Sequence, residues 1–597
     1  MAITSVPGAR TRARLVIALI CAIAATVLLH ASPASAAEFS CPTTGNPIPC
    51  ENALPADLPS EWVPGQPDNQ SIEGYPTSMG VDVGQTEYFK IDTASTSYHI
   101  DILRLGWYGG AGARLITTIT PSVALPQSQP ACIDQAGTGL IDCGNWAVSA
   151  SWAVPTNAVS GVYVAYLVDN NTSAKSSIEF VVRNDASTSD MLVQTSDTTW
   201  EAYNSYGGNS LYICSLDCPT GSPGGYKGAS AVSYNRPFLI TGTDLQGDDE
   251  PYGADEKEVF WAEYPMIQFL EREGYNVSYT NESEVEQDPA LLENHKIFVS
   301  SGHDEYWSAG QRASVQTAIN DGVNVAFFSG NEMFWKTRWA SSIDGSDTPY
   351  RTIVSYKETH YNAPVDPDDP PTWTGTWRDP RFSPPADGDQ PENAVTGQLG
   401  LVDYGTADIT VPYQYSKLRL WRNTAVASLK AGQTQTLAPG AGTLGFEWDV
   451  DADNGFRPTG EFDLSSTTVS GVNAFYNDYG TTEAVNTTAT HNLTQYRAPS
   501  GALVFGAGTV DWAWGLDSWN GNNTAPDPNM EQATVNLFAD MGNVQPATLE
   551  SGLVAATEST DHTPPTSTIT SPSSGASYSD GSSVTVTGTA TDSGGGV

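Results

Sequence analysis

The stretch from Ile297 to Trp335 constrains the fold of this chain more than any other. It runs through an apolar segment, a polar turn, a helix-like segment, a second apolar segment and a second polar turn. That order predicts a strand, a helix and a parallel strand, with polar groups collected where the strands end. Ser308, followed three residues later by Gln311, predicts a capping box at the start of the helix.

The segments around this unit predict the fold class. Strand-like runs at 191–194 and 276–279 and a helix at 263–273 precede it. Strands that alternate with helices at this spacing predict a parallel, doubly wound sheet. Later strand-like runs, which predict antiparallel additions, lie at 351–356, 418–421, 444–448 and 502–505. We therefore expect an α/β domain with antiparallel β additions over residues 187–544.

Both flanks of this domain have a different pattern. Short alternating runs separated by Gly, Pro, Asn and Ser predict a β-sandwich at 73–186, after an irregular lead-in at 37–72. We expect the sandwich to pack on the next domain, with glycan binding as the alternative. After a linker at 545–564, residues 565–597 resemble a partial immunoglobulin-like repeat. They are too few for a sandwich of about a hundred residues, so we expect a fragment.

Residues 1–36 predict export. Arg10, Arg12 and Arg14 precede an apolar run, which ends in a small-residue cleavage site at Ala36. A membrane anchor is the alternative, but the run is short for a membrane span. We expect a signal peptide cleaved near Ala36 and a secreted protein that is not an integral membrane protein.

The six cysteines after the leader form close pairs in the sequence. The pairs are Cys41 with Cys50, Cys132 with Cys143, and Cys214 with Cys218. In an oxidising compartment they predict three local disulfides. A zinc site is the alternative, but the spacings do not repeat and no histidine lies nearby.

Net charge and composition limit the partners and the degree of order. The formal net charge is -42, and so acidic a surface repels nucleic acid and anionic membranes. We expect neither as a partner. Hydrophobic residues make up 39% of the chain, which is enough for packed cores and argues against general disorder.

The first polar turn carries the residues best suited to chemistry. His303, Glu305 and Tyr306 follow a buried strand, where imidazole, carboxylate and phenol suit metal binding or general acid-base catalysis. The alternative is structural: His303 and Asp304 cap the turn, and Tyr306 and Trp307 pack beneath it. The second turn has neither a Gly-x-Ser-x-Gly elbow nor a cysteine, which excludes the simplest serine-hydrolase and amidotransferase mechanisms.

Three motifs together resemble a known family. They are GHDEYWS at 302–308, TWEAYN in a predicted aromatic loop at 199–208, and GNEMFW at 330–335. In this order they resemble the C-terminal domain of the N,N-dimethylformamidase large (β) subunit, over residues 187–543. The resemblance implies a flavodoxin-like parallel sheet core, of the glutamine amidotransferase kind but without its cysteine.

The resemblance also implies a mononuclear iron, which two tyrosinates and a glutamate hold as a Lewis acid for a small amide and its attacking water. Tyr306 matches the tyrosine of the family motif. The second tyrosine is expected near the start of the preceding helix, where Tyr264 is the candidate. For the glutamate we take Glu358, although Glu332 is nearer in sequence and neither lies in a matching motif.

Two functions of different classes follow. The first is a secreted, iron-dependent hydrolase of linear amides, with His303 and Glu305 as catalytic residues. The alternative is a non-catalytic extracellular protein, which binds polysaccharide or cell wall through exposed tryptophans such as Trp373 and Trp377 in a long loop at 359–392. A glycosidase ranks last, because no pair of carboxylates stands out.

Overall fold

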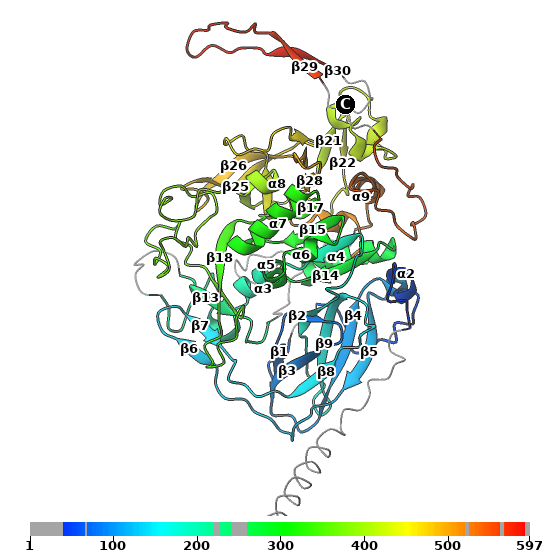
Figure 1. Cartoon of the computed structure of the whole chain (residues 1–597), viewed down its shortest axis with the longest axis vertical. Helices are drawn as coiled ribbons and strands as arrows, with labels where there is room; N and C mark the ends of the chain where they lie inside the picture. Colours follow the sequence, from blue (N-terminus) through cyan, green and yellow to red (C-terminus); the bar gives the residue numbers. More distant parts are fainter. Residues whose placement is uncertain are drawn as a thin grey trace, which may run out of the picture. The chain divides into compact units, whose positions relative to one another are not determined.

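A computed structural model describes residues 40–65, 68–219, 227–239, 259–519, 524–560 and 566–591. The predicted leader at 1–36 lies outside the described residues. Within these ranges the chain is rich in strands, which form several separate sheets, and has few helices (Figure 1). None of the described helices is both long and apolar enough to cross a membrane.

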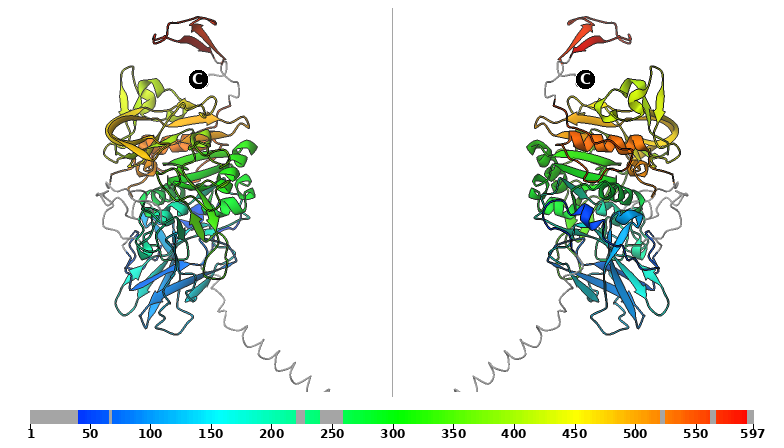
Figure 2. Two further views of the ribbon diagram at one scale, coloured as in Figure 1. Left: turned by 90° about the vertical axis from the view of Figure 1, so that its left-hand side faces the viewer. Right: turned by 90° about the vertical axis from the view of Figure 1, so that its right-hand side faces the viewer.

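Two facing sheets follow the lead-in, where the alternating runs predict a sandwich. Their strands are β1 (Ile72–Pro76), β2 (Gly80–Asp82), β3 (Thr86–Thr93), β4 (Tyr98–Leu105), β5 (Ala113–Ile119), β8 (Ala150–Ala153), β9 (Gly161–Asp169), β10 (Lys175–Ser176) and β11 (Glu179–Arg183). One sheet has the order β1-β3-β8 and the other β2-β11-β9-β4-β5, with β10 beside β9 (Figure 2, blue and cyan). The rings of Phe89 and Phe180 join the sheets, with centroids 5.7 Å apart.

The predicted strand–helix–strand unit lies at the centre of a larger sheet, which has seven strands in the described part of the chain. In spatial order these are β14 (Val277–Thr280), β12 (Met191–Gln194), β15 (Ile297–His303), β17 (Asn324–Gly330), β28 (Leu503–Gly506), β27 (Thr494–Arg497) and β24 (Phe462–Asp463). The first five are parallel, and β27 and β24 continue the sheet through antiparallel pairs. Both polar turns therefore follow the carboxyl ends of neighbouring parallel strands.

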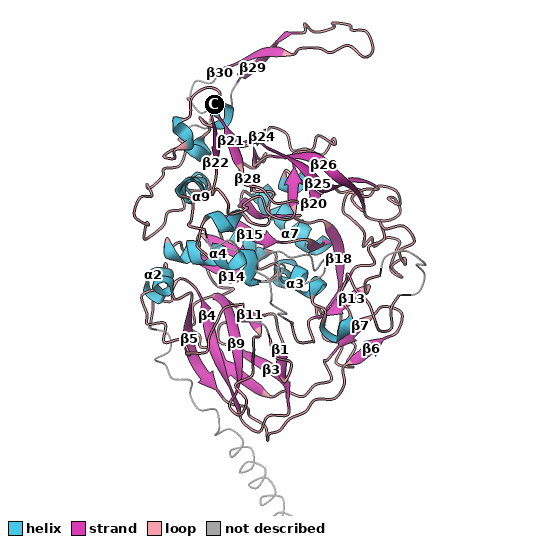
Figure 3. Cartoon of the chain, turned by 180° about the vertical axis from the view of Figure 1, so that it is seen from behind, coloured by secondary structure: helices cyan, strands magenta, loops and turns pink. Residues whose placement is uncertain are grey.

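Helices pack on both faces of this sheet. Helix α7 (Ala309–Asp321) begins after Ser308, and the predicted capping box with Gln311 is present. Its apolar side packs in one core cluster with Phe327 of β17. On the opposite face the ring of Phe328 lies 5.8 Å from that of Phe538 in α9 (Pro528–Asp540), and α4 (Val259–Arg272) contacts β15 (Figure 3).

The remaining elements surround this core. The other α-helices of the described residues are α2 (Ile48–Glu51), α3 (Asp197–Tyr203), α5 (Glu282–Gln287), α6 (Ala290–Glu293) and α8 (Asn393–Thr396). One sheet has the order β13 (Ala231–Ser233), β19 (Thr352–Val354), β18 (Trp335–Ala340) and β16 (Tyr306–Ser308). Another has the order β23 (Trp448–Val450), β20 (Leu399–Tyr404), β25 (Thr467–Asn477) and β26 (Thr482–His491). The described residues also form three two-stranded antiparallel sheets, which pair β6 (Ile133–Gln135) with β7 (Leu140–Asp142), β21 (Thr410–Pro412) with β22 (Thr434–Thr436), and β29 (Thr566–Ser571) with β30 (Thr587–Thr591).

Several local predictions were wrong. The aromatic segment at 199–208, predicted as a loop, lies largely in helix α3 and a short 3-10 turn at Tyr206–Gly208. Helix α4 begins at Val259, earlier than predicted, so Pro265 lies inside it. The run at 418–421 is no strand but contains a 3-10 turn at Arg419–Trp421. Leu420 and Trp421 are buried there, and a short apolar run does not distinguish a buried turn from a strand.

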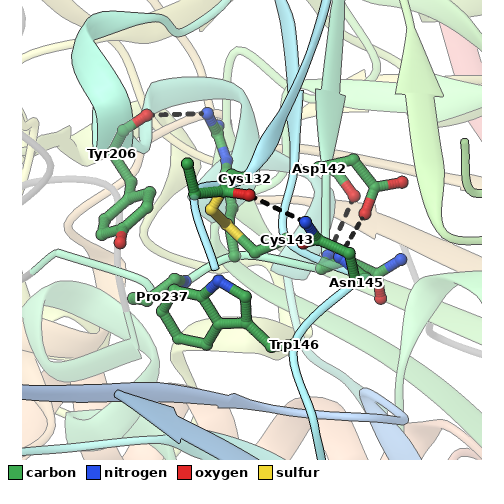
Figure 4. Close-up of a disulfide and its surroundings, with 12 residues drawn as sticks. Cys132, Asp142, Cys143, Asn145, Trp146, Tyr206 and Pro237 are labelled. Atoms are coloured by element: carbon green, nitrogen blue, oxygen red, sulfur yellow. Dashed lines mark hydrogen bonds between the residues drawn. A yellow bond between two sulfur atoms is a disulfide. The ribbon is translucent and has the colours of Figure 1, made fainter. Parts of the chain in front are cut away.

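The three predicted disulfides are present, and the zinc alternative was wrong. They join Cys41 to Cys50, Cys132 to Cys143 and Cys214 to Cys218. Figure 4 shows the Cys132–Cys143 bridge beside Trp146. Trp146 packs with Tyr75 and Ile141 in a small core cluster that contains Cys143. The bridge therefore fixes a loop against strand β1.

Trp373 and Trp377 are not exposed, so that prediction was wrong. Each has only 1% of its surface exposed. Trp377 belongs to the same core cluster as Trp307, and the guanidinium of Arg312 lies 4.5 Å from its ring centroid. The long loop at 359–392 thus folds its two large indole rings inward, because burial of that much apolar surface stabilises the loop.

Candidate active site

The first polar turn owes its path to Gly302. Its φ is +91°, and a Cβ there would lie 3.0 Å from Cγ of Glu263 in α4. Only glycine fits both the backbone angle and the close approach. The chain then leaves the central sheet and enters β16, where Tyr306 pairs with Trp335 of β18. The amide of Trp335 also donates to the Glu305 carbonyl at 2.9 Å, which joins the two turns.

Two tyrosines bind the carboxylate of Glu305, and a third binds one of them. Tyr203 Oη donates to Glu305 Oε2 at 2.9 Å, and Tyr212 Oη donates to Oε1 at 2.9 Å. Tyr306 Oη donates to Tyr212 Oη at 2.5 Å. Glu305, Tyr203 and Tyr306 are buried, whereas Tyr212 is only partly so. We call these four residues the tyrosine cluster.

A histidine and a second carboxylate border the tyrosine cluster. His303 Nε2 lies 2.7 Å from Glu447 Oε2 and 3.6 Å from Glu305 Oε2. Glu447 also accepts a 2.8 Å hydrogen bond from Nδ2 of Asn331, which belongs to the second polar turn. The second turn, where a nucleophile was excluded, therefore holds Glu447 against His303.

Lys357 brings a positive charge to the same place. Its side chain is fully buried, and its ammonium lies 3.5 Å from the ring centroid of Tyr212 and 4.7 Å from that of Trp335. Burial lowers the pKa of Lys357 to about 7, although Glu305 and Glu447 oppose the shift. The group can therefore exchange a proton near neutral pH.

Burial also perturbs the acids of the tyrosine cluster. It raises the pKa of Glu305, an effect that the charge of His303 opposes. It raises the pKa of Tyr203 and Tyr212 well above the usual value, and the nearby Glu305 adds to this. Perturbed groups of opposite charge at the end of a parallel strand are typical of a reaction centre.

The predicted site residues divide into two groups. The structure brings His303, Glu305 and Tyr306 together. It places Tyr264 elsewhere: a Cβ at Gly112 of the sandwich would lie 2.0 Å from the Tyr264 hydroxyl. Glu358 accepts hydrogen bonds from the backbone amides of Asp366 and Thr374, at 3.0 and 2.8 Å, so it binds the long loop.

Glu332 and Asp304 belong to a buried network beneath the turn. Asp304 accepts hydrogen bonds from Gln194, Ser300 and Trp307. Ser300 also donates to Glu332 Oε2 at 3.2 Å. Trp307 is fully buried, as the structural alternative predicts, whereas Asp304 accepts from side chains and Ser308 caps the helix instead.

Sequence reasoning missed four residues of this site. Tyr203 lies within the TWEAYN motif, which indicated the family but did not identify Tyr203 as a site residue. Tyr212 precedes the Cys214–Cys218 bridge, and so short a bridge indicates a loop held in place. Lys357 and Glu447 are ionisable residues next to apolar or aromatic neighbours in the sequence, and this pattern indicates a buried functional residue only weakly.

Comparison with known proteins places these residues in a family. The model of a family described as N,N-dimethylformamidase beta subunit-like, C-terminal, matches residues 99–527, and a bacterial Ig domain matches 565–597. No curated protein matches. Among solved structures, the alignment with a family 123 glycoside hydrolase from Clostridium perfringens covers 44% of this chain and 72% of the hydrolase chain, at 10% identity. Its TM-score of 0.09 is too low to support any argument about fold or function.

The family match confirms the resemblance and extends it. It begins at residue 99, inside the facing sheets, rather than near 187. It includes all three motifs and every residue of the tyrosine cluster. Because the match covers well over half of its length, the chain belongs to the N,N-dimethylformamidase beta subunit-like C-terminal family.

Proposed function

We propose that the protein is a secreted hydrolase of small linear amides, with its reaction centre at the tyrosine cluster. One observation carries the proposal: the phenol of Tyr212 contacts both the carboxylate of Glu305 and the phenol of Tyr306 where a parallel strand ends. Such a convergence of acidic oxygens, bordered by an imidazole and an ammonium, suits hydrolysis of a polar bond.

The order of the parallel strands supports both a flavodoxin-like core and this position for the site. Numbered along the chain, the five parallel strands are arranged 2-1-3-4-5, which is the order of flavodoxin-like folds. In such sheets ligands bind where the strand order reverses, here between β12 and β15. Tyr203 follows β12, and Glu305 and Tyr306 follow β15.

The oxygens of the tyrosine cluster fit an iron ion. Tyr212 Oη lies 2.5 Å from Tyr306 Oη and 2.9 Å from Glu305 Oε1, so two phenols and one carboxylate present hard donors at one point. We assign Tyr212, Tyr306 and Glu305 as the ligands, in place of Tyr264 and Glu358. Bound iron would supply Lewis acidity to the amide carbonyl and to the attacking water.

The remaining residues of the site would move protons and balance charge. His303, oriented by Glu447 at 2.7 Å, would take a proton from the attacking water and return it to the departing amine. Lys357 would offset the charge of the carboxylates and of the developing oxyanion. Water thus adds across the C–N bond, and the products are a carboxylic acid and an amine.

The cysteine pairs support export of this enzyme. Three disulfides occur among the described residues, and disulfides persist in oxidising compartments outside the cytosol. Together with the leader predicted at 1–36, they support a secreted protein cleaved near Ala36.

Metal analysis of the exported protein tests the proposal, combined with release of ammonia from formamide and acetamide and of an amine from N,N-dimethylformamide, both called amine release below. We expect stoichiometric iron, a tyrosinate-to-iron absorption band, and amine release from at least one amide. Tyr212→Phe and Tyr306→Phe should each abolish all three. Tyr264→Phe is the matched control, because it makes the same change at a buried tyrosine elsewhere, and it should keep them.

Circular dichroism of each variant establishes that it is folded. A folded wild-type protein without iron would refute the metal assignment. Equal loss of iron in Tyr264→Phe and Tyr212→Phe would refute the choice of ligands. Iron without amine release from any of the amides would refute the reaction.

A further inference from the structure

A cavity lies next to the segment that carries Lys357. Its volume is about 520 Å³, within the range of small-molecule sites. The residues on its walls that matter here are Glu358, Tyr361, Arg381, Phe382 and Asp478. None of them belongs to the tyrosine cluster or borders it.

Two aromatic rings at this cavity are exposed to solvent. The exposed fraction is 85% for Tyr361 and 51% for Phe382. Phe382 is held in place by the buried Trp373, since their ring centroids lie 5.4 Å apart with the planes inclined by 31°. Aromatic rings that are left in water at the mouth of a cavity indicate a surface that contacts a ligand.

The charged side chains of the cavity disfavour an anionic ligand. Arg381 is already paired, because its Nη2 lies 2.6 Å from Asp379 Oδ2 and its guanidinium stacks 4.9 Å from the ring centroid of Tyr479. Carboxylates of Glu358 and Asp478 also line the walls. They offer acceptors to hydroxyl groups and repel other anions.

We propose that this cavity binds a neutral oligosaccharide. The apolar C–H face of a sugar ring suits stacking on Tyr361 and Phe382. Its hydroxyl groups suit the carboxylates of Glu358 and Asp478 and the guanidinium of Arg381. The site is separate from the proposed amide-hydrolysing centre and would hold the secreted protein on an extracellular glycan.

Calorimetric titration of the full exported chain tests this proposal. The probes are neutral hexasaccharides of β-1,4-linked glucose, xylose and N-acetylglucosamine, with hexagalacturonate as the anionic comparison. We expect saturable binding of at least one neutral probe and none of hexagalacturonate. Tyr361→Ala should weaken that binding about tenfold, through the lost stacking, whereas Tyr361→Phe should keep it.

The matched control is Tyr88→Ala, which removes a tyrosine that is 45% exposed on strand β3, away from the cavity. It should bind as the wild type does. The proposal is overturned if no neutral probe binds, if hexagalacturonate binds as tightly, or if Tyr361→Ala binds like the wild type. Iron content should be unchanged in Tyr361→Ala, so this test is independent of the proposed enzyme activity.

Discussion

Neighbouring acids in the turn after β15 have different partners and therefore different roles. Glu305 accepts hydrogen bonds from two phenols at a partly accessible cluster. Asp304 points the other way and accepts from Gln194 and Ser300 at 2.8 Å and from Trp307 at 2.7 Å. Because Asp304 is fully buried, the donors of Gln194 and Trp307 depend on it, while Ser300 also donates to Glu332. Asp304 thus stabilises the turn that presents Glu305.

Replacement of Asp304 should lower stability strongly. In Asp304→Ala the buried donors of Gln194 and Trp307 lose their acceptor, whereas Ser300 keeps Glu332, so we expect the free energy of unfolding to fall by about 3 kcal/mol or more. Urea denaturation followed by circular dichroism measures this. Asp304→Asn keeps one acceptor oxygen and similar volume, so its loss should be smaller. A change of only about 0.5 kcal/mol in Asp304→Ala, as for a surface substitution, would contradict the role.

Single residues of the site differ in how far the sequence alone could find them. Tyr306 was found because it lies just past a recognisable strand and matches the tyrosine of the family motif. Tyr212 was missed because it lies in a loop between distant elements, and tertiary contacts and the Cys214–Cys218 bridge determine where that loop runs. Tyr264 was chosen by its position along the chain, but α4 turns its ring toward the Trp519 ring, 5.3 Å away.

At the scale of elements, short-range signals were the reliable ones. The capping box of α7 lies within four consecutive residues, Ser308 to Gln311, so the sequence contains all of it. The strands β15 and β17 are long apolar runs buried on both faces, and they were also predicted. The start of α4 was not predicted, because all residues of its first turn, Val259 to Ala262, are buried and show no amphipathic pattern.

Strand β11 should make stability depend on pH. Burial raises the pKa of Glu179 to about 7, above its ordinary value of 4.5. A raised carboxyl pKa adds stability below the unfolded pKa, and this contribution is lost as pH rises through the folded pKa. We therefore expect Glu179 to contribute up to about 3 kcal/mol below pH 4.5 that disappears between pH 4.5 and 7.

Urea denaturation across this pH range measures the effect. Glu179→Gln cannot ionise, so the fall in stability between pH 4.5 and 7 should be smaller than in the wild type. Glu483→Gln, at an exposed position of β26, is the control and should follow the wild-type curve. Parallel wild-type and Glu179→Gln curves would show that the carboxyl of Glu179 does not carry the pH dependence.

At the scale of the whole molecule, a buried ion pair joins the facing sheets to the α/β core. Arg104 of β4 contacts Glu271 of α4 through Nη2–Oε1 at 2.6 Å and Nη1–Oε2 at 2.9 Å, and both side chains are fully buried. Asn52 of the lead-in and Tyr279 of β14 also donate to Glu271. The ion pair supports the packing role expected for the sandwich. Arg104 and Glu271 both lie within the residues that the family model matches.

Removal of both charges of this pair should cost well below the sum of the two single removals. Arg104→Met or Glu271→Met leaves its partner charged and buried, and we expect each to lower the free energy of unfolding by about 3 to 5 kcal/mol. The double variant leaves neither member of the pair as an unpaired buried charge, so its loss should be well below the sum of the two. Calorimetry and urea denaturation of the four proteins complete the cycle. Because the pair joins the sandwich to the α/β core, the wild type should unfold in one transition. Additive losses of unfolding free energy in the double variant, or separate early melting of the sandwich, would contradict this coupling.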